Sequence, residues 1–322
     1  MADPSPSNPA DSGDAPASGG SHLRPVVRRH LGIDLITALR PRQWTKNLLV
    51  FVAPAAAGIL SQRLSFLHAL GAFWIMCAAA SGTYLLNDAM DAEADRRHPV
   101  KVHRPIASGA VSEPLAIALS VVLIVVSVAG AAILSGWMLV AVVASYITIT
   151  VAYTIYLKRE PVVELAAVAS GFVLRAIAGG VVTHIPLSSW FLVVISFGAL
   201  FIVTGKRAAE SISLGDDGPA HRPVLGSYTK TFLQSTLVLT AGVTTTGYCL
   251  WAFERAGSLG LSGHHAIWTE LTVAPVILGI LHVLRLADSG HVGEPEEMVF
   301  HDRLLQILGL VWVVLFALGI YA

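Results

Sequence analysis

Nine apolar runs, each near the ~20 residues that cross a bilayer as an α-helix, constrain this fold more than any other feature. Only 13% of the 322 residues are charged, whereas soluble domains carry about 25%. We therefore expect an all-α, polytopic bundle of nine transmembrane helices whose first helix begins near Pro41. The runs lie at about 45–60, 66–86, 114–134, 137–157, 162–182, 187–205, 231–253, 266–286 and 304–322.

The basic residues divide unequally between the two sides that nine crossings define. The N-terminal flank and the second, fourth, sixth and eighth connections hold 18 of the 21 Lys and Arg residues. The opposite side holds only Arg63 and Arg255, and Arg175 lies inside a span. Because Lys and Arg collect in cytoplasmic loops, the pattern predicts a cytoplasmic N-terminus and an external C-terminus.

The first 22 residues differ from the rest of the chain. They are rich in Pro, Ser, Gly and Asp and show no apolar periodicity, which predicts a disordered tail. One transmembrane domain, residues 23–322, is expected to follow it. We expect a multi-pass protein of the plasma membrane whose partner is the bilayer and not nucleic acid; the sequence leaves the oligomeric state open, homo-oligomers included.

The stretch "NDAMDAEAD" at 87–95 places four acidic residues directly after an apolar run. On a helix that turns ~100° per residue, Asn87, Asp88, Asp91 and Asp95 share one face and Glu93 points away. Acids at a membrane boundary are costly and usually functional. Because Mg²⁺ takes one or two carboxylates plus substrate phosphates, the motif predicts a magnesium site on a bound diphosphate.

We assign the residues of this site separately. Asp88 and Asp91 are the expected Mg²⁺ ligands, Asp95 is a ligand directly or through water, and Asn87 bonds a phosphate oxygen or completes the metal shell. The alternative is a solvated helix end whose acids pair with the neighbouring bases Arg96 and Arg97.

Several other residues are expected around a substrate cavity. Arg175 is costly inside an apolar span unless it has a partner. Glu164 shares its face but lies ~16 Å along the axis, so the two cannot pair directly. We favour a cavity role for both; a structural pairing of Arg175 with another helix is the alternative. Further substrate-binding candidates on the cytoplasmic side are Lys46, Tyr84, Arg104, Lys158, Lys206, Arg207 and Glu210.

Several of these candidates have a plainer interpretation. Lys46 would then be a snorkelling or orientation charge. Lys206 and Glu210, one helical turn apart, would form a surface ion pair. Tyr84, one turn before Asp88, would line the bundle.

"NDAMDAEAD" resembles the N-D-x-x-D-x-x-x-D motif of the UbiA superfamily of intramembrane prenyltransferases. The resemblance implies an all-helical bundle whose cavity opens toward the cytoplasm and the lipid. It also implies that the aspartates hold Mg²⁺ on a diphosphate. Most members carry a second D-x-x-x-D motif between spans six and seven, where this chain has only the adjacent Asp216 and Asp217.

Four further stretches resemble one branch of that superfamily, the decaprenyl-phosphate phosphoribosyltransferases of mycobacteria and relatives. They are "RPRQWTKNLLVFVAP" (40–54), "HRPIASG" (103–109), "REPVVELAAVASGFVLRAIAGG" (159–180) and "GKRAAE" (205–210). This likeness implies that the phosphate of a polyprenyl phosphate attacks the anomeric carbon of 5-phosphoribosyl diphosphate (PRPP). Diphosphate leaves, and the product is a precursor of cell-wall arabinose. Asp88, Asp91 and Arg175 are the expected catalytic residues.

Two rival functions stay open at the level of the sequence. One is a prenyltransferase that uses a prenyl diphosphate donor and an aromatic or other acceptor. The other is a transporter of an anionic lipid or sugar phosphate, although the chain shows no convincing internal repeat of the kind many transporters have. The many bases on one face favour phosphoribosyl transfer from PRPP over prenyl transfer, because PRPP brings a diphosphate and a 5′-phosphate and the acceptor brings a third phosphate group.

Overall fold

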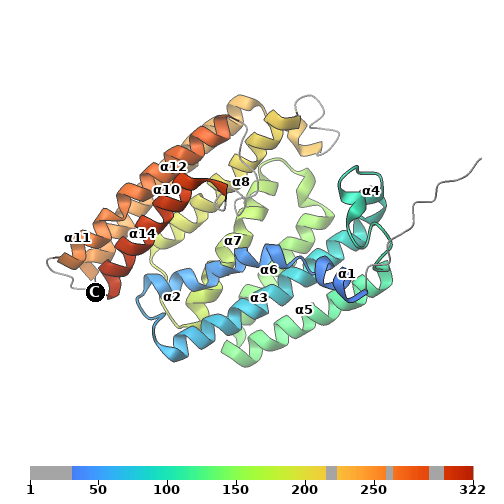
Figure 1. The fold of residues 1–322 in the computed structure, drawn as a ribbon. Helices are drawn as coiled ribbons and strands as arrows, with labels where there is room; N and C mark the ends of the chain where they lie inside the picture. Colours follow the sequence, from blue (N-terminus) through green and yellow to red (C-terminus); the bar gives the residue numbers. More distant parts are fainter. Residues whose placement is uncertain (1–30, 215–222, 259–263, 290–300, 322) are drawn as a thin grey trace, which may run out of the picture.

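The computed structural model describes residues 31–214, 223–258, 264–289 and 301–321, and within these ranges it is built from helices joined by turns (Figure 1). The predicted tail, residues 1–22, and Asp216 and Asp217 lie outside the described residues. The helices are α1 (Leu31–Ala38), the 3₁₀ helix η1 (Pro41–Phe51), α2 (Val52–Ala56), α3 (Arg63–Met90), α4 (Ala92–Arg96), η2 (Lys101–His103), α5 (Glu113–Ser135), α6 (Trp137–Ile155), η3 (Leu157–Arg159), α7 (Val163–Val182), α8 (Ser189–Leu214), η5 (Pro223–Ser227), α10 (Lys230–Ser258), α11 (His264–Leu271), α12 (Val273–Asp288) and α14 (Arg303–Tyr321).

Eight helical segments of the described chain are long and apolar enough to cross a membrane. They confirm the predicted runs from the second to the ninth. The eighth run is formed by α11 and α12 together, as a segment over Ala266–Asp288. The protein is therefore a multi-pass, all-helical membrane protein.

The first predicted run, 45–60, differs from the α-helix we expected. The chain forms a 3₁₀ helix over Pro41–Phe51 and only then a short α-helix, Val52–Ala56. Arg40 precedes it in a left-handed conformation, with φ 55° and ψ 59°. A residue before proline is kept out of the right-handed α region, so the chain enters this segment through a fixed bend at Arg40–Pro41.

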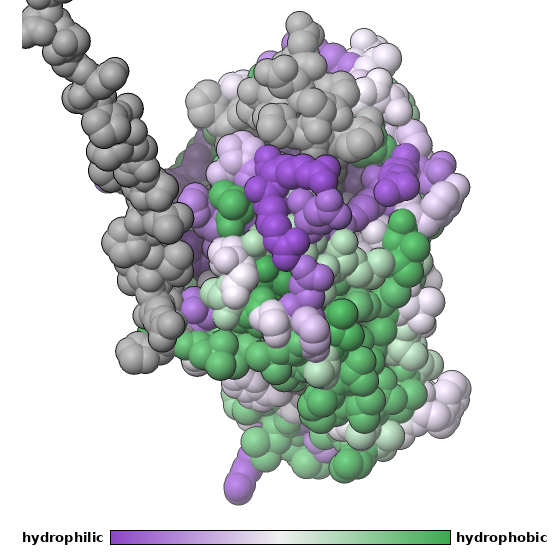
Figure 2. All heavy atoms as spheres, turned by 90° about the vertical axis from the view of Figure 1, so that its right-hand side faces the viewer, coloured by the Kyte–Doolittle hydropathy of each residue, from purple (hydrophilic) through white to green (hydrophobic). Residues whose placement is uncertain are grey.

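The outward surface is what a lipid environment requires. Val121, Val122, Val125 and Val126 of α5 are all exposed, and so is Leu310 of α14. Figure 2 shows a broad hydrophobic surface on one side of the molecule, with hydrophilic residues gathered above it. Apolar side chains turned outward at this density are stable only against lipid or another apolar surface.

Helix α7 lies at the centre of the bundle and contacts η1, α2, α3, α6 and α8 (Figure 1). Gly179 of α7 permits the closest of these approaches. A Cβ built on Gly179 would lie 1.9 Å from the carbonyl oxygen of Val50. This contact therefore needs glycine, and it fixes η1 against the helix that carries Glu164 and Arg175.

Gly179→Ala is expected to displace η1 and lower the unfolding temperature in detergent by several degrees, because backbone atoms cannot yield as a side chain does. Gly242→Ala in α10 is the matched control, since its Cβ would meet nothing within 4 Å. Thermal unfolding of both variants checks the prediction. Equal unfolding temperatures would show that η1 does not depend on this contact.

Candidate active site

The acidic motif lies where α3 ends and α4 begins. We expected one continuous helix through Asp95, and the structure corrects this: the helix is interrupted at Asp91, with φ −94° and ψ 5°. Hydrogen bonds nevertheless run from the Asp91 amide to the Asn87 carbonyl (2.9 Å) and from the Asp95 amide to the Asp91 carbonyl (2.8 Å). The backbone therefore departs from helical geometry at Asp91, while these two hydrogen bonds continue across it.

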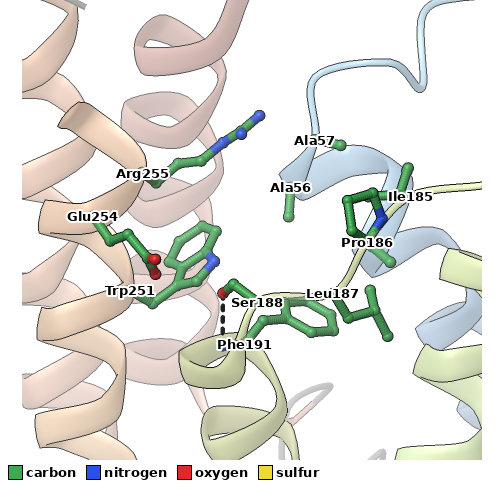
Figure 3. A pocket seen from close by; sticks show the side chains of 11 residues that line it. Ala56, Ala57, Ile185, Pro186, Leu187, Ser188, Phe191, Trp251, Glu254 and Arg255 are labelled. Atoms are coloured by element: carbon green, nitrogen blue, oxygen red, sulfur yellow. Dashed lines mark hydrogen bonds between the residues drawn. The ribbon is translucent and has the colours of Figure 1, made fainter. Parts of the chain in front are cut away.

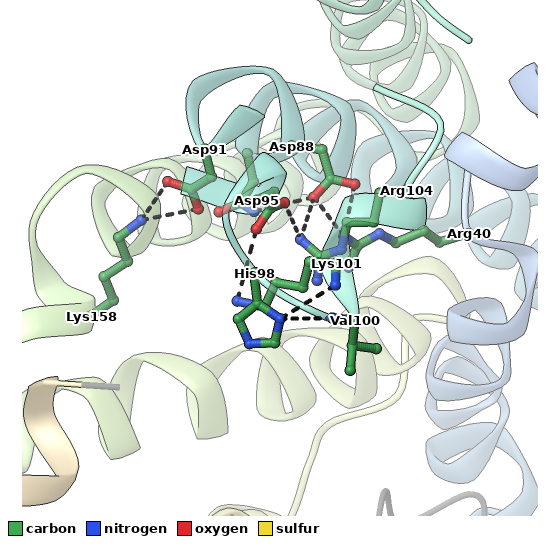
Figure 4. A network of polar contacts seen from close by, with 10 residues as sticks. Arg40, Asp88, Asp91, Asp95, His98, Val100, Lys101, Arg104 and Lys158 are labelled. Atoms are coloured by element: carbon green, nitrogen blue, oxygen red, sulfur yellow. Dashed lines mark hydrogen bonds and ion pairs between the residues drawn. The ribbon is translucent and has the colours of Figure 1, made fainter. Parts of the chain in front are cut away.

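Asp88 is buried and bound by two arginines from other segments (Figure 4). Nη2 of Arg40 donates to both carboxylate oxygens, at 2.5 and 2.7 Å. Nη1 of Arg104 lies 3.2 Å from Oδ1 of Asp88 and also donates to Oδ2 of Asp95, at 2.7 Å. Arg104 therefore bridges two acids of the motif, and Arg40 adds a second positive charge to one of them.

Asp91 faces a different base. Nζ of Lys158, in η3, lies 2.9 and 3.1 Å from the two carboxylate oxygens of Asp91 (Figure 4). The pairing with Arg96 and Arg97 that we weighed as an alternative is wrong for these three aspartates, because Arg96 contacts Glu113 and Arg97 contacts Glu93.

Arg175 is buried and makes three hydrogen bonds. Its Nε donates to Oδ1 of Asn47 (2.6 Å), its Nη1 to the Gly171 carbonyl (2.6 Å) and its Nη2 to the Tyr146 hydroxyl (3.0 Å). The guanidinium also lies over the Tyr146 ring, 4.8 Å from its centre. This is the pairing with other helices that the sequence left open, and the same guanidinium also lines a cavity described below.

Glu164 and Arg207 form a second buried group. Nε and Nη2 of Arg207 donate to the two oxygens of Glu164 at 2.7 and 2.9 Å, and Nη1 lies 3.0 Å from Glu210. Glu164 is fully buried and does not line the cavity. A planar fork that meets a carboxylate with two bonds is rigid, so this pair fixes α7 against α8.

A polar cavity of about 360 Å³ gathers many of the predicted residues in one place. The guanidinium groups of Arg40 and Arg104 lie between it and the buried Asp88. Asp88, Asp91, Asp95, Lys158, Glu164 and Glu210 are not among its lining residues. The predicted residues that line it are Lys46, Tyr84, Asn87, Arg104, Arg175, Lys206 and Arg207.

An apolar groove of about 740 Å³ adjoins this cavity. Lys46, Phe172 and Ile202 line both hollows. The remaining wall of the groove comes from η1, α8, α10, α12 and α14, and it includes Gly279, Leu308 and Trp312. The polar cavity and the apolar groove thus lie side by side and share part of their walls.

A smaller cavity of about 210 Å³ lies toward the opposite end of α7 and α10 (Figure 3). Trp251, Glu254 and Arg255 line it together with Ser188 and Phe191, whose amide donates to the Ser188 hydroxyl at 3.2 Å. None of the predicted site residues lines it. The polar cavity is therefore the candidate active site.

The donor set near the cavity fits Mg²⁺ chemically. Asp88, Asp91 and Asn87 offer hard oxygen ligands, and Mg²⁺ needs only one or two carboxylates when phosphates complete its shell. In the described part of the chain no three His, Cys, Asp or Glu side chains gather closely enough to hold a metal by themselves. The residues therefore fit a metal that arrives with a phosphate ligand, and they do not fit an all-protein metal cage.

The sequence analysis missed Arg40, Tyr146 and Tyr228. Arg40 reaches an acid 48 residues away; its position before Pro41, inside a stretch already singled out, was the available signal. Tyr146 lies in an apolar run and contacts Arg175 only through the packing of α6 on α7. Tyr228 binds the backbone of Val162, 66 residues away, and nothing local in the sequence marks it.

The fold, the polar cavity and the apolar groove define a class of protein. It is a multi-pass helical membrane protein in which an acidic motif and several bases lie beside an apolar groove. The model of the UbiA prenyltransferase family matches residues 48–320. The chain belongs to this family.

Curated relatives and solved structures agree with this membership. Decaprenyl-phosphate phosphoribosyltransferase of Mycobacterium tuberculosis (strain H37Rv) is 44% identical over 292 residues, which cover 88% of this chain and 93% of that protein. The protein of the same name from Corynebacterium glutamicum is 40% identical over 298 residues, 91% of this chain and 88% of that one. A solved UbiA homolog from Archaeoglobus fulgidus, bound to DMAPP and Mg²⁺, has a TM-score of 0.66 and 17% identity, and covers 89% of this chain and 97% of that one.

Arg104→Gln is expected to tighten binding of a free divalent cation by about tenfold, because it removes a positive charge that lies between two buried carboxylates. Titration with Mn²⁺, followed by electron paramagnetic resonance or calorimetry, measures this affinity. Arg96→Gln is the control, since Arg96 pairs with the exposed Glu113. Unchanged or weaker binding by Arg104→Gln would show that Arg104 does not compete with a cation for these acids.

Proposed function

We propose that this protein transfers 5-phosphoribose from PRPP to a polyprenyl phosphate and releases diphosphate. The observation that carries the proposal is that Lys46, Phe172 and Ile202 line both the polar cavity and the apolar groove. We call this shared part of the two walls the junction. A soluble, multiply charged sugar donor and a long-chain lipid acceptor need such a pair of compartments. The names of relatives that are 40–44% identical over about nine-tenths of the chain support the same reaction.

The donor, PRPP, binds in the polar cavity. PRPP carries a diphosphate and a separate 5′-phosphate, and the cavity presents bases from three directions. Arg40 and Arg104 lie next to the acidic motif, Arg175 projects from α7, and Lys206 and Arg207 come from α8. Fixed cations at these points offset the repulsion between two anionic substrates.

Asp88 and Asp91 would hold Mg²⁺, Asp95 directly or through water, and Asn87 would complete the shell or bond a phosphate oxygen. When bound, the metal would neutralise charge on the leaving diphosphate. The Mg²⁺ bound together with DMAPP in the Archaeoglobus homolog supports this use of a divalent cation. The bases that now contact these acids would then turn to phosphate oxygens.

The acceptor, a polyprenyl phosphate, binds from the side of the apolar groove. Its isoprenoid chain lies along the apolar groove, and its phosphate stops at Lys46, which sits at the junction and contacts Gln43 at 2.5 Å. This places one phosphate oxygen beside the polar cavity that holds the sugar. Lys46 thus acts as a phosphate-binding residue rather than as an orientation charge alone.

The chemistry then needs no strong general base, because the acceptor phosphate is already an anion. Its oxygen attacks the anomeric carbon while the bond from that carbon to the diphosphate breaks, which inverts the anomeric configuration. Arg175 is held by three hydrogen bonds on the cavity wall, so its charge is preorganised toward the reacting phosphates. Tyr84, which also lines the cavity, supplies a polar contact to the ribose.

We further propose that the chain crosses the plasma membrane nine times and that the polar cavity faces the cytoplasm. A 3₁₀ helix rises ~2 Å per residue, so 41–51 followed by the short α2 extends over about 30 Å, the thickness of the hydrocarbon core. The first segment can therefore cross in 16 residues, 41–56. Lys and Arg residues concentrate on the side of the polar cavity, which supports a cytoplasmic N-terminus.

The proposal is tested by incubating the purified protein with labelled PRPP, a polyprenyl phosphate and Mg²⁺. Label is expected in the organic phase, and Asp88→Asn and Asp91→Asn are each expected to reduce the rate at least 1000-fold through loss of the metal ligands. Glu93→Gln is the matched control, because Glu93 lies in the same motif with its side chain 77% exposed and paired with Arg97. It should retain near-normal activity.

Two outcomes would contradict the proposal. Consumption of a prenyl diphosphate with an aromatic acceptor, and no lipid-linked label from PRPP, would assign ordinary prenyl transfer. Full activity of Asp88→Asn or Asp91→Asn at low Mg²⁺ would remove the metal assignment.

Gly279→Leu is expected to raise KM for a long-chain polyprenyl phosphate at least tenfold and to leave KM for PRPP within twofold. Gly279 lines the groove, and a Cβ there meets open space, so the larger side chain fills the groove without a clash inside the fold. Gly242→Leu is the control, since Gly242 also has open space beside it but lies outside the groove. Equal KM values for the lipid in both variants would place the acceptor elsewhere.

A further inference from the structure

The turn that leads into α7 has a rare backbone conformation. Val162 has φ 66° and ψ −46°, and the Val163 amide donates to the Pro161 carbonyl at 2.7 Å. A hydrogen bond across one residue with positive φ defines a classic γ-turn, which is uncommon and strained. A β-branched residue is among the least suited to it. Such a conformation persists only where its surroundings hold it in place.

Tyr228 makes the contact that holds this turn. The Val162 amide donates to the Tyr228 hydroxyl at 2.8 Å, and that hydroxyl lies 3.5 Å from Oε1 of Glu164. Tyr228 is buried and stacks on Phe232, with ring centres 5.6 Å apart. A phenol is protonated at neutral pH, and burial raises the pKa of Tyr228 further, so the hydroxyl can donate to Glu164 while it accepts from Val162.

The turn lies between two ion-paired groups next to the candidate active site. Four residues before Val162, Lys158 binds Asp91 of the acidic motif. Two residues after it, Glu164 accepts both bonds of the Arg207 fork, and Arg207 lines the polar cavity. A change in the turn at Val162 would therefore move Lys158 relative to the acids while the Glu164–Arg207 pair stayed fixed.

We infer that Tyr228 is a positioning residue for the donor site: its hydroxyl holds the Val162 turn and thereby sets Lys158 against the acidic motif. Tyr228 lies just after η5, in the chain between α8 and α10, and η5 contacts η3 directly. The connection between α8 and α10 thus contributes a tyrosine to the site. The inference rests on the proposed function in one respect, that the ligand whose binding it affects is PRPP.

Tyr228→Phe tests this inference, because it keeps the ring and its stacking on Phe232 and removes only the hydroxyl. The variant is expected to raise KM for PRPP at least fivefold, to leave KM for the polyprenyl phosphate within twofold, and to speed hydrogen exchange at amides 157–164 at least tenfold. Tyr321→Phe is the matched control, since Tyr321 is exposed at the end of α14.

A second variant separates positioning from general destabilisation. Val162→Gly in the Tyr228→Phe background is expected to recover at least half of the lost PRPP affinity, measured on a logarithmic scale, because glycine adopts positive φ without strain. Faster exchange throughout the bundle, an equal rise in both KM values, or no recovery with glycine would overturn the inference. If the parent protein does not bind PRPP, the proposed function fails, and exchange at 157–164 still decides whether Tyr228 holds the turn.

Discussion

Arg104 bridges Asp88 and Asp95, and the rest of the site depends on the positive charge that this side chain places between the two carboxylates. Three aspartates within one helical segment at the edge of an apolar bundle would repel one another and resist burial. Arg40 and Lys158 complete the neutralisation from two other segments, so the N-terminal bend, the 95–104 turn and η3 all converge on the motif. The same contacts that stabilise the acids place positive charge at the wall of the polar cavity.

The bases of the site fall into two groups with different mechanical roles. Arg175 and Arg207 are buried. Arg175 is hydrogen-bonded to partners in η1, α6 and α7, and Arg207 to carboxylates in α7 and α8, so neither can leave without a large cost. Arg40, Arg104 and Lys158 are each about a quarter exposed and pair with carboxylates, and Arg40 also lies over the Tyr84 ring. They can exchange those carboxylates for phosphate oxygens. Fixed bases and bases that can change partners together suit this donor. It binds with a cation, and its diphosphate group leaves after the transfer.

The sequence predicted the parts of this arrangement that are local. Eight membrane-crossing segments follow from run length alone, and the motif at 87–95 marked Asp88, Asp91 and Asp95 because acids are rare in such surroundings. It could not predict the 3₁₀ path of η1, a segment that packs closely against Gly179 of α7. Nor could it reveal the partners of the acids or the contact of Tyr228 with the Val162 turn, since these contacts join segments far apart in the chain and arise only from the packing of the bundle.

The central claim is that the acids of the motif exchange their bases for a metal-bound diphosphate. A structure of the protein with Mg²⁺, PRPP and a non-reactive acceptor analogue tests this most directly. We predict a cation in contact with Asp88 and Asp91, the diphosphate on that cation, and the guanidinium groups of Arg40 and Arg104 on phosphate oxygens. If PRPP binds while Asp88 keeps both arginines and no cation lies at the motif, the account is contradicted.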